Sequence, residues 1–322
     1  MSRANDLRRR CWTIPVYLMA AAAVWAGLPL LATITLVVDV VRPRRWVVTR
    51  LTMMSAVYLA VETLGILAIT VTAIFPSELK IRATYAIQRM WAEALYQALR
   101  RLFSLRLVVR GEENLAESPF LLVSRHTSIV DTLIPAHLVT RLHGIKLRYV
   151  LKRELLVDPC LDLAGSRLPN RFVDRAARAD QASLVAELAA DLQRGEAILI
   201  YPEGTRFTPE KQRRHLERLA RRNPGMYRLA RDLRWVMPPR PGGVLAALEA
   251  NPLDVVTLTH TGLEGLATVA DLFDGRLVGR TIEVELWRTP HSEIPGDRAA
   301  RVEWILGLWS RVDGWVGERL AR

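Results

Sequence analysis

The sequence predicts an α/β domain that follows two apolar, membrane-associated segments. In the middle of the chain, short apolar runs of strand character alternate with stretches of helical periodicity, a pattern typical of an α/β sheet whose site lies beyond the strand ends. The first 77 residues differ from the rest, because residues 13–38 contain no charged side chain and residues 51–77 carry only Glu62. We therefore expect an anchor over residues 1–77 and one folded domain over residues 78–322.

The first apolar segment is long enough to cross a membrane. As a helix, residues 13–38 would extend about 39 Å, against about 30 Å for the hydrocarbon core of a bilayer. Residues 8–10 are arginines that precede it as in a secretory signal, but the run is too long for one and lacks a clear small-residue cleavage site. We therefore expect this segment to stay in the membrane.

The orientation in the membrane is less clearly marked, because basic residues flank both ends of both apolar segments. Two spanning helices would carry the Arg-rich connection between them across the membrane, whereas a hairpin that enters and returns would keep every basic cluster on one side. Pro15 and Pro29 could kink the first segment towards either arrangement. Both arrangements leave the N-terminus and the folded domain on the same side.

The folded domain is expected to alternate between helices and strands. Residues 82–103 have the apolar spacing of a helix, with aromatic residues interleaved, which indicates packing in the core or on a membrane surface. Residues 176–194 are predicted as an Ala- and Leu-rich helix closed by Gly195, and residues 297–320 as a helix with an apolar stripe. The expected strands are residues 105–109, 120–124, 147–151, 197–200, 254–262 and 281–287.

The chain is strongly basic, with a formal net charge of +12, and half of its residues are hydrophobic. Residues 211–240 hold ten Lys or Arg against Glu217 and Asp232, so this segment carries 10 − 2 = +8 of that charge. A solvated surface and nucleic acid are alternatives to lipid, but the segment lacks a nucleic-acid-binding motif and regularly spaced aromatic residues. Beside two apolar segments we favour anionic membrane lipids as the partner and expect no nucleic acid.

The stretch FLLVSRHTSIVD, residues 120–131, places a histidine and an aspartate just after a predicted strand. On a helix, positions five apart point about 140° away from each other, so His126 and Asp131 would have to meet in a turn. We expect Ser128 or the threonine before it to cap a helix that begins near Ile129, with Asp131 in its first turn. There the carboxylate can hold the imidazole in one tautomer and favour its protonated form, as a general base needs.

Chance is the alternative explanation of this pair, because a His and an Asp five residues apart often occur without any function. No metal-ligand set, thiol nucleophile or GxSxG elbow accompanies the histidine, so we expect neither a metal nor an organic cofactor. Cys11 and Cys160 have no disulfide or metal-site spacing, which is in keeping with a reducing compartment.

Two further motifs support a catalytic interpretation and, with the first, carry a family resemblance. FVDR spans residues 172–175, and YPEGTRF, residues 201–207, follows a predicted strand. In this order the three blocks resemble the glycerolipid acyltransferases typified by bacterial 1-acyl-glycerol-3-phosphate acyltransferase. The matching positions are His126, Ser128 and Asp131 in the first block, Lys152, Glu154, Leu155, Phe172, Val173 and Arg175 in the second, and Pro202, Glu203, Gly204, Thr205 and Arg206 in the third.

The chain departs from the family pattern at two places. Arg125 stands where the first block usually has Asn, and residues 254–262, with Thr257, lack the proline of the usual fourth block. Together with residues 236–250, the second departure resembles the branch that contains the lysocardiolipin and lysophosphatidylinositol acyltransferases and related bacterial membrane enzymes. The resemblance covers about residues 75–290.

The resemblance implies a mixed sheet flanked by helices and an acyltransferase that needs no cofactor. It implies transfer of a fatty acyl group from acyl-CoA or acyl-carrier protein to the free hydroxyl of a lysophospholipid. The foremost acceptor is 1-acyl-sn-glycerol-3-phosphate, with lysocardiolipin and lysophosphatidylinositol as alternatives. His126 is the implied general base and Asp131 its partner. The implied substrate-binding residues are Lys152, Arg175, Glu203, Gly204, Thr205 and Arg206.

Other interpretations stay open at this point. A non-catalytic lipid-binding or scaffolding protein on the same fold would suit Arg125, because a cation beside the base disfavours the imidazolium, although Arg125 could also point away or bind the donor's phosphates. Glu203 and Arg206 could form an internal salt bridge rather than bind substrate. An enzyme of this family would lie in the bacterial inner membrane with its domain in the cytosol, where the acyl donors are.

Overall fold

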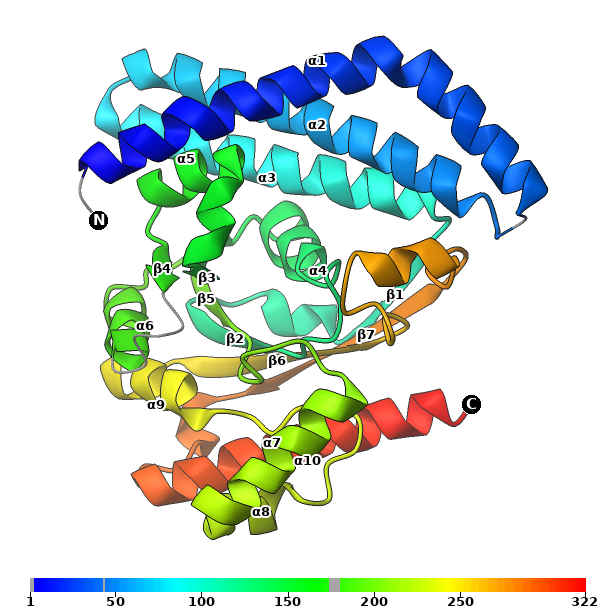
Figure 1. Cartoon of the computed structure of the whole chain (residues 1–322). Helices are drawn as coiled ribbons and strands as arrows, with labels where there is room; N and C mark the ends of the chain where they lie inside the picture. Colours follow the sequence, from blue (N-terminus) through cyan, green and yellow to red (C-terminus); the bar gives the residue numbers. More distant parts are fainter. Residues whose placement is uncertain (1–2, 43, 174–179) are drawn as a thin grey trace.

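The computed structural model describes residues 3–42, 44–173 and 180–322 (Figure 1). Its centre is a mixed sheet with helices on both faces, as predicted. The strands follow each other across the sheet in the order β1-β7-β6-β2-β5-β3-β4. Their bounds are β1 (Arg106–Arg110), β2 (Phe120–Ser124), β3 (Lys146–Lys152), β4 (Arg171–Val173), β5 (Glu196–Ile200), β6 (Asp254–Thr261) and β7 (Thr281–Thr289).

The strand directions bring several strand ends to one edge of the sheet. β6, β2, β5, β3 and β4 pair in parallel, whereas β7 runs antiparallel to β6 and parallel to β1. The carboxyl ends of the parallel strands therefore meet at one edge, which is where sites form in sheets of this kind. β2 lies between β5 and β6, and all five of its residues are buried. This burial on both faces explains the apolar run that ends at Ser124.

The side chains of β2 alternate between two hydrophobic cores. Phe120 and Leu122 point into the core that also contains Leu99 of α3. Leu121 and Val123 point into the second core, beneath α6, α9 and α10. This alternation is the period of two that a strand imposes on its side chains.

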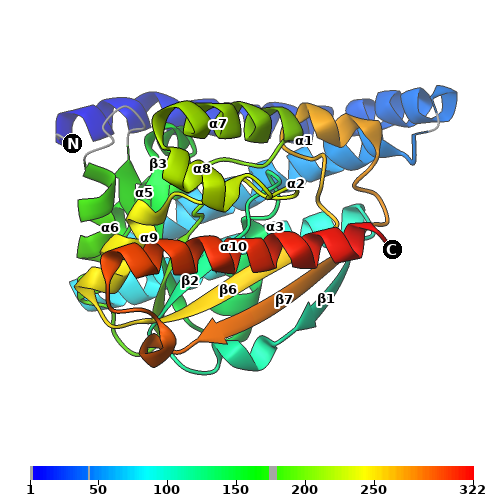
Figure 2. The same ribbon diagram turned by 90° about the horizontal axis from the view of Figure 1, so that it is seen from below.

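Helices cover both faces of the sheet (Figures 1 and 2). In Figure 1, α1, α2 and α3 are stacked on one side of the sheet, and α7, α8 and α10 lie on the other. The helix bounds are α1 (Arg3–Val41), α2 (Val47–Val71), α3 (Ser77–Leu102), α4 (Leu133–Pro135), α5 (Pro159–Arg167), α6 (Asp180–Ala190), α7 (Pro209–Arg222), α8 (Pro224–Ala230), α9 (Pro241–Ala250) and α10 (Arg298–Leu320).

The long helices were predicted to within a few residues. The helix expected over 82–103 begins earlier, directly after Pro76, whose fixed backbone suits the entry to a helix. At the start of α10 the Asp297 side chain caps the helix by accepting the backbone N–H of Ala300 at 2.9 Å. The helix expected over 176–194 is seen as α6, which ends at Ala190, and its expected first residues lie outside the described part of the chain.

α1 and α2 form a hairpin, and both helices are long and apolar enough to cross a membrane. The hairpin does not stand apart from the domain, because α2 packs on α3 and α5. Near the start of α1, Arg9 and Arg10 each donate to the buried Asp162 at 2.8 Å. Just beyond its other end, Arg45 donates to the Val278 carbonyl at 3.0 Å. Both ends of the long helix are therefore fastened to the domain.

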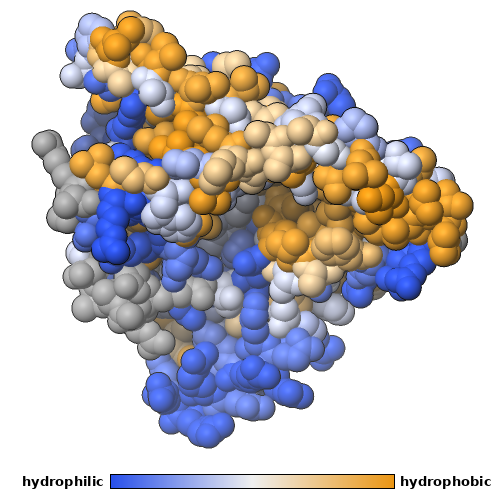
Figure 3. Space-filling view, turned by 45° about the horizontal axis from the view of Figure 1, so that its top comes forward, coloured by the Kyte–Doolittle hydropathy of each residue, from blue (hydrophilic) through white to orange (hydrophobic). Residues whose placement is uncertain are grey.

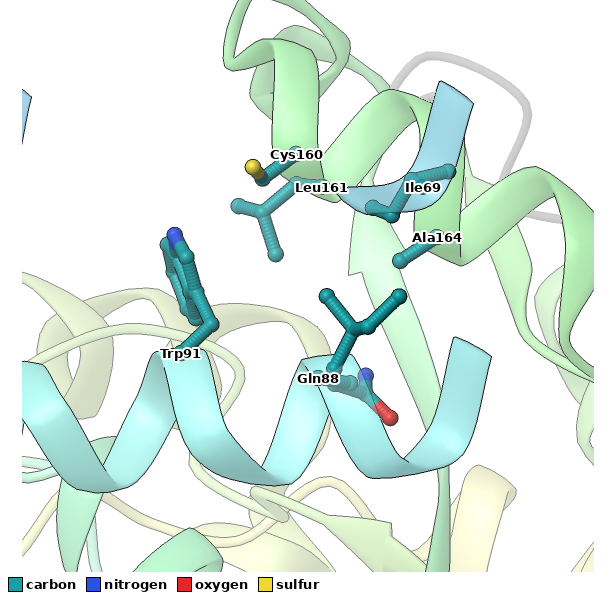
Figure 4. A pocket seen from close by; sticks show the side chains of 7 residues that line it. Ile69, Gln88, Trp91, Cys160, Leu161 and Ala164 are labelled. Carbon is teal, nitrogen blue, oxygen red and sulfur yellow. The ribbon is translucent and has the colours of Figure 1, made fainter. Parts of the chain in front are cut away.

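Close packing joins α2, α3 and α5 around a small cavity (Figure 4). Ile69 of α2, Trp91 of α3 and Cys160 of α5 help to line it, and its volume of about 10 Å³ has room for about one water molecule. Gly65 lies beside it, where an added Cβ would come within 2.5 Å of the Cys160 sulfur. The hairpin and the domain therefore share a tight contact, in which Cys160 is a buried residue with a free thiol.

Candidate active site

His126 lies at the edge where the parallel strands end, two residues beyond β2. Its Nδ1 is 3.0 Å from Oδ1 and 3.2 Å from Oδ2 of Asp131, so the two side chains meet in the turn after the strand, as expected. The predicted start of the following helix was wrong. α4 begins at Leu133 rather than near Ile129, and Asp131 precedes it.

The Asp131 carboxylate itself closes the turn that precedes α4. Its Oδ2 accepts the backbone N–H of Thr127 at 2.7 Å and that of Ser128 at 2.8 Å. The Ser128 hydroxyl, which we expected as a helix cap, accepts the backbone N–H of Val130 at 3.2 Å and also donates to the carbonyl of Leu266 at 3.0 Å. The turn is therefore held by its own carboxylate and by the loop that follows β6.

The contact between Asp131 and His126 prepares the imidazole to accept a proton. Burial, the strongest influence, raises the pKa of Asp131, but the hydrogen bond and charge of His126, the nearby His260 and the Ser128 N–H together lower it below its ordinary value. An ionised carboxylate can only accept hydrogen bonds, so Nδ1 carries the hydrogen and Nε2 keeps its lone pair. The His126 side chain is 14% exposed, and the Tyr201 ring packs against the imidazole with 4.6 Å between the two ring centroids.

Glu203 holds the backbone of His126 from the neighbouring strand end. The loop 201–207 follows β5, and within it the fully buried Glu203 accepts the backbone N–H of His126 at 2.8 Å and that of Met237 at 2.9 Å. The N–H of Phe207 donates to the His126 carbonyl at 2.8 Å. Both polar groups of the His126 backbone are thus bound by the loop that carries PEGTR.

Arg206 does not pair with Glu203. Its Nη1 donates to the Ala267 carbonyl at 2.6 Å, and the residues that the structure describes include no ion pair between the two side chains. The internal salt bridge is therefore not formed. Gly204, between them, has a positive φ of 65°, and an added Cβ there would lie 3.2 Å from a guanidinium nitrogen of Arg240. A second arginine thus lies against the same loop.

Two of the remaining candidate residues lie at the ends of neighbouring strands. Lys152 ends β3, which β5 separates from β2. Thr205 is partly exposed in the loop after β5. Arg175 lies outside the described residues. The structure thus brings the predicted catalytic pair and the PEGTR glutamate into direct contact.

Arg125 points away from the catalytic pair. Its buried guanidinium donates to Glu264 Oε1 at 2.7 Å, to the His260 carbonyl at 2.6 Å and to the Trp235 carbonyl at 2.9 Å. Burial would raise the pKa of Glu264, but the charge and hydrogen bond of Arg125 lower it, so the pair is ionic. A side chain buried in this way cannot reach the phosphates of an acyl donor, and its charge is balanced by Glu264.

Two residues of this region were missed by sequence reasoning. His260 lies in β6, where its Nε2 is 3.7 Å from Asp131 Oδ2 and donates to the Arg125 carbonyl at 3.2 Å. Burial lowers the pKa of His260 to about 4, so the ring is neutral at pH 7. No sequence motif singles out Arg240, which is one of the ten basic residues of segment 211–240. Although imidazole and carboxylate groups gather here, no group of His, Cys, Asp and Glu in the described ranges could hold a metal ion.

Similar proteins share this part of the chain. Residues 106–259 match the model of the family described as "Acyltransferase". The 1-acyl-sn-glycerol-3-phosphate acyltransferase of Pseudomonas aeruginosa is 27% identical over 261 residues, which cover 80% of this chain and 84% of that protein. The protein of the same name from Saccharomyces cerevisiae is 26% identical over 125 residues, 38% of this chain and 40% of that protein.

A solved structure shares the fold. The crystal structure of the 1-acyl-sn-glycerophosphate (LPA) acyltransferase from Thermotoga maritima aligns with a TM-score of 0.54 and 15% identity, covering 84% of this chain and 96% of that chain. The segment that matches the family model contains His126, Asp131 and Glu203, so it includes the cluster described above.

We predict that Glu203→Gln changes how stability depends on pH. Burial raises the pKa of Glu203 to about 8, although the charge of Arg125 and two backbone N–H groups lower it. The folded protein therefore holds this proton to a higher pH than the unfolded chain does. Its contribution to the unfolding free energy is present below the ordinary value of 4.5 and is lost as the pH rises to about 8. A glutamine does not titrate, so the variant should lack this decline.

Chemical unfolding of the protein in detergent at a series of pH values measures this difference. Glu113→Gln is the matched control, because Glu113 is exposed, and it should follow the wild type. If Glu203→Gln and the wild type gave parallel stability curves across this pH range, the buried, proton-holding state of Glu203 would be refuted.

Proposed function

Because the chain belongs to the glycerolipid acyltransferase family, we propose that it transfers a fatty acyl group from a thioester to the free hydroxyl of 1-acyl-sn-glycerol-3-phosphate, giving phosphatidic acid. Two relatives carry the name of this reaction. The observation that carries the mechanism is the contact of His126 with the buried Asp131 at the edge of the sheet. Acyl-CoA or acyl-carrier protein is the donor, and lysocardiolipin and lysophosphatidylinositol are the alternative acceptors.

Nε2 of His126 is the general base in this mechanism. It takes the proton of the acceptor hydroxyl while the hydroxyl oxygen attacks the carbonyl carbon of the thioester. The tetrahedral intermediate then collapses, the carbon–sulfur bond breaks, and the leaving thiolate takes the proton from the imidazolium. Asp131 orients the ring and stabilises the imidazolium through Nδ1. The reaction forms no acyl-enzyme and uses neither a metal nor an organic cofactor.

Arg206 binds the phosphate of the acceptor in this proposal. A guanidinium presents a planar fork that can hold two phosphate oxygens at once. The position of Arg206 supports this role, because the side chain is partly exposed and is fixed through one nitrogen to the carbonyl of Ala267. The other proposed substrate-binding residues are Lys152, Arg175, Gly204 and Thr205.

Two buried ionisable residues support an enzyme over a non-catalytic scaffold. Glu203 uses both carboxylate oxygens on backbone N–H groups, so we assign it to positioning His126 rather than to contacting substrate. Arg125, which suited the scaffold interpretation, is bound to Glu264 and to two carbonyls away from the imidazole. Arg125 therefore does not oppose an imidazolium at His126, because Glu264 balances its charge.

The α1–α2 hairpin holds the enzyme at the membrane. A helix that crossed the bilayer would carry one of its ends about 30 Å away from the domain. Here contacts near both ends of α1 reach the domain, at Asp162 and at Val278. This arrangement favours a hairpin that enters and returns on one side. We take that side to be the cytoplasmic face of the bacterial inner membrane, because the acyl donors are in the cytosol.

The basic segment 211–240 contacts the same membrane in this proposal. It forms most of α7, α8 and the connection to α9. In Figure 2 α7 and α1 lie along the same edge of the view, although Figure 1 places them on opposite faces of the sheet. In Figure 3 the apolar surface of the hairpin lies above a hollow, and a strongly hydrophilic surface lies below it. A bilayer that contains anionic lipids would attract both surfaces at once.

We predict that His126→Ala and Asp131→Asn lower acyl transfer by about a hundredfold to ten-thousandfold, the range typical for loss of a general base. Both proteins should still fold into membranes, because neither side chain lies in the two hydrophobic cores. The assay follows radiolabelled acyl-CoA with a panel of lysophospholipids. His143→Ala is the matched control, since His143 pairs with Glu112 and lies away from the site. Near-full turnover by purified His126→Ala would reject the mechanism.

We predict that Arg206→Lys harms binding of the acceptor and spares the donor. Lysine keeps the charge but loses the fork, so KM for the phosphate-bearing lysophospholipid should rise while KM for the acyl thioester stays nearly unchanged. The melting temperature should stay close to that of the wild type, because Arg206 makes no ion pair with Glu203 within the described chain. Equal loss for both substrates together with a lower melting temperature would sink the phosphate-binding assignment.

A further inference from the structure

A hollow of about 400 Å³ lies where the hairpin turns, and the proposed reaction does not use it. Arg45 lines it from the connection between α1 and α2, and the rest of the lining comes from the turn between the short 3₁₀ helix η5 (Ala270–Asp274) and β7. These residues are Asp274, Gly275, Arg276 and Arg280. The two segments touch, since an added Cβ at Gly275 would lie 3.0 Å from the Arg44 carbonyl oxygen. Two distant parts of the chain thus build one basic site.

The three arginines of this hollow are held in place. Nη1 of Arg45 donates to the Val278 carbonyl at 3.0 Å, and Nε of Arg280 donates to the Arg276 carbonyl at 2.8 Å. Nε of Arg276 pairs with a carboxylate oxygen of Asp274 at 2.6 Å. Side chains that are fixed before binding lose less conformational entropy when a ligand arrives.

The net positive charge of the hollow favours an anionic ligand. Three guanidinium groups face one carboxylate, so the net charge is 3 − 1 = +2. A guanidinium has five N–H donors, and the contacts of these arginines with other described residues use only one or two each. The remaining donors suit the oxygens of a phosphate, which arginine can bind through two N–H groups at once.

Exposed apolar side chains lie near the hollow and indicate that its phosphate-bearing ligand lies at a membrane surface. Trp46 and Val41 come from the hairpin turn and are 46% and 73% exposed, and Phe273 and Val269 come from η5 and the residue before it and are 48% and 63% exposed. Tryptophan is common at the level of lipid headgroups. At this end of the molecule, on the right of Figure 3, hydrophilic residues border the apolar surface directly. The phosphates of a bilayer lie at such a boundary.

We propose that this hollow binds the headgroup phosphate of an anionic phospholipid of the bilayer, while Trp46 and Phe273 enter the headgroup region beside it. A free phosphate would satisfy the arginines but would leave the apolar side chains in water, so a lipid is the ligand that fits both. The bound lipid serves to dock the protein and is not consumed. The proposal therefore holds or fails independently of acyl transfer.

A single loop connects the hollow to the candidate active site. A guanidinium nitrogen of Arg276 lies 2.9 Å from where a Cβ of Gly265 would be. The carbonyl of the next residue, Leu266, accepts the Ser128 hydroxyl at 3.0 Å and the Ile129 N–H at 3.1 Å. Arg276 therefore lies against the loop that braces the turn of His126 and Asp131, so a lipid held by Arg276 would be linked to that turn through one side chain.

The test uses the full chain in non-ionic detergent micelles, titrated with phosphatidylglycerol or with phosphatidylcholine, with bound lipid counted by native mass spectrometry. Arg276→Gln/Arg280→Gln should weaken phosphatidylglycerol binding about 30-fold, because each basic residue near a lipid surface contributes about 1 kcal/mol. Phosphatidylcholine has the same phosphate but also a compensating cation, so the wild type should bind it more weakly, and the variant should lose less of this binding than of phosphatidylglycerol binding. The matched control, Arg110→Gln/Arg194→Gln, removes two exposed arginines at the opposite edge of the sheet and should have less than about a twofold effect.

A second variant separates a built site from general charge. Arg276→Lys/Arg280→Lys keeps the charge and loses the fork, so it should still bind phosphatidylglycerol several-fold more weakly than the wild type. Melting temperatures establish that each variant is folded. Equal losses in the Gln variant and its control, or full binding by the Lys variant, would overturn the site, since general attraction would then explain the binding.

Inorganic phosphate decides between a lipid and a free anion. At constant ionic strength it should not displace phosphatidylglycerol from the wild type, and it should not raise the melting temperature of the wild type above that of Arg276→Gln/Arg280→Gln. Stabilisation by phosphate that the double variant lacks would mean that the hollow takes a free phosphate, and the lipid assignment would be wrong.

Discussion

The buried carboxylate of Asp131 is the constraint on which the candidate site depends. It binds Nδ1 of His126 and also accepts the backbone N–H groups of Thr127 and Ser128. A carboxylate buried this deeply is costly unless several donors satisfy it, and here the donors come from the turn that carries it. The shape of the turn and the tautomer of the base therefore have the same origin. Glu203 adds a second support by binding the backbone N–H of His126.

The contact of His126 with Asp131 could be predicted from the sequence. Both residues follow a predicted strand in one short segment, and side chains five residues apart cannot meet on a helix, so they had to meet in a turn. The start of α4 was predicted too early. The Ser128 hydroxyl does accept the Val130 N–H, but the Asp131 carboxylate folds back onto the N–H groups of Thr127 and Ser128, and the regular helix begins only at Leu133. The rest of the site depends on sheet order, which brings β6 beside β2. No local sequence pattern predicts that Arg125 pairs with Glu264 or that His260 lies next to Asp131.

The hairpin, too, was predictable only in part: its helices follow from local sequence, whereas its contacts with the domain do not. Its two apolar helices are plain in the sequence, but charge alone left both spanning and returning arrangements open. The structure supplies the missing contacts, because Asp162 and the carbonyl of Val278 bind arginines near the two ends of α1. In the proposed arrangement, an apolar helix held to the domain near both of its ends would place the membrane surface, and with it the lipid acceptor, next to the candidate site.

The tautomer of the neutral His126 imidazole tests this account most directly. With ¹⁵N-labelled histidine in the full chain and assignment by comparison with His126→Ala, the imidazole nitrogen chemical shifts report the tautomer at neutral pH. The account predicts a hydrogen on Nδ1 and a lone pair on Nε2, with this preference lost in Asp131→Asn. A neutral ring with its hydrogen on Nε2 in the wild type would contradict the account, because the atom that must take the substrate's proton would already carry one.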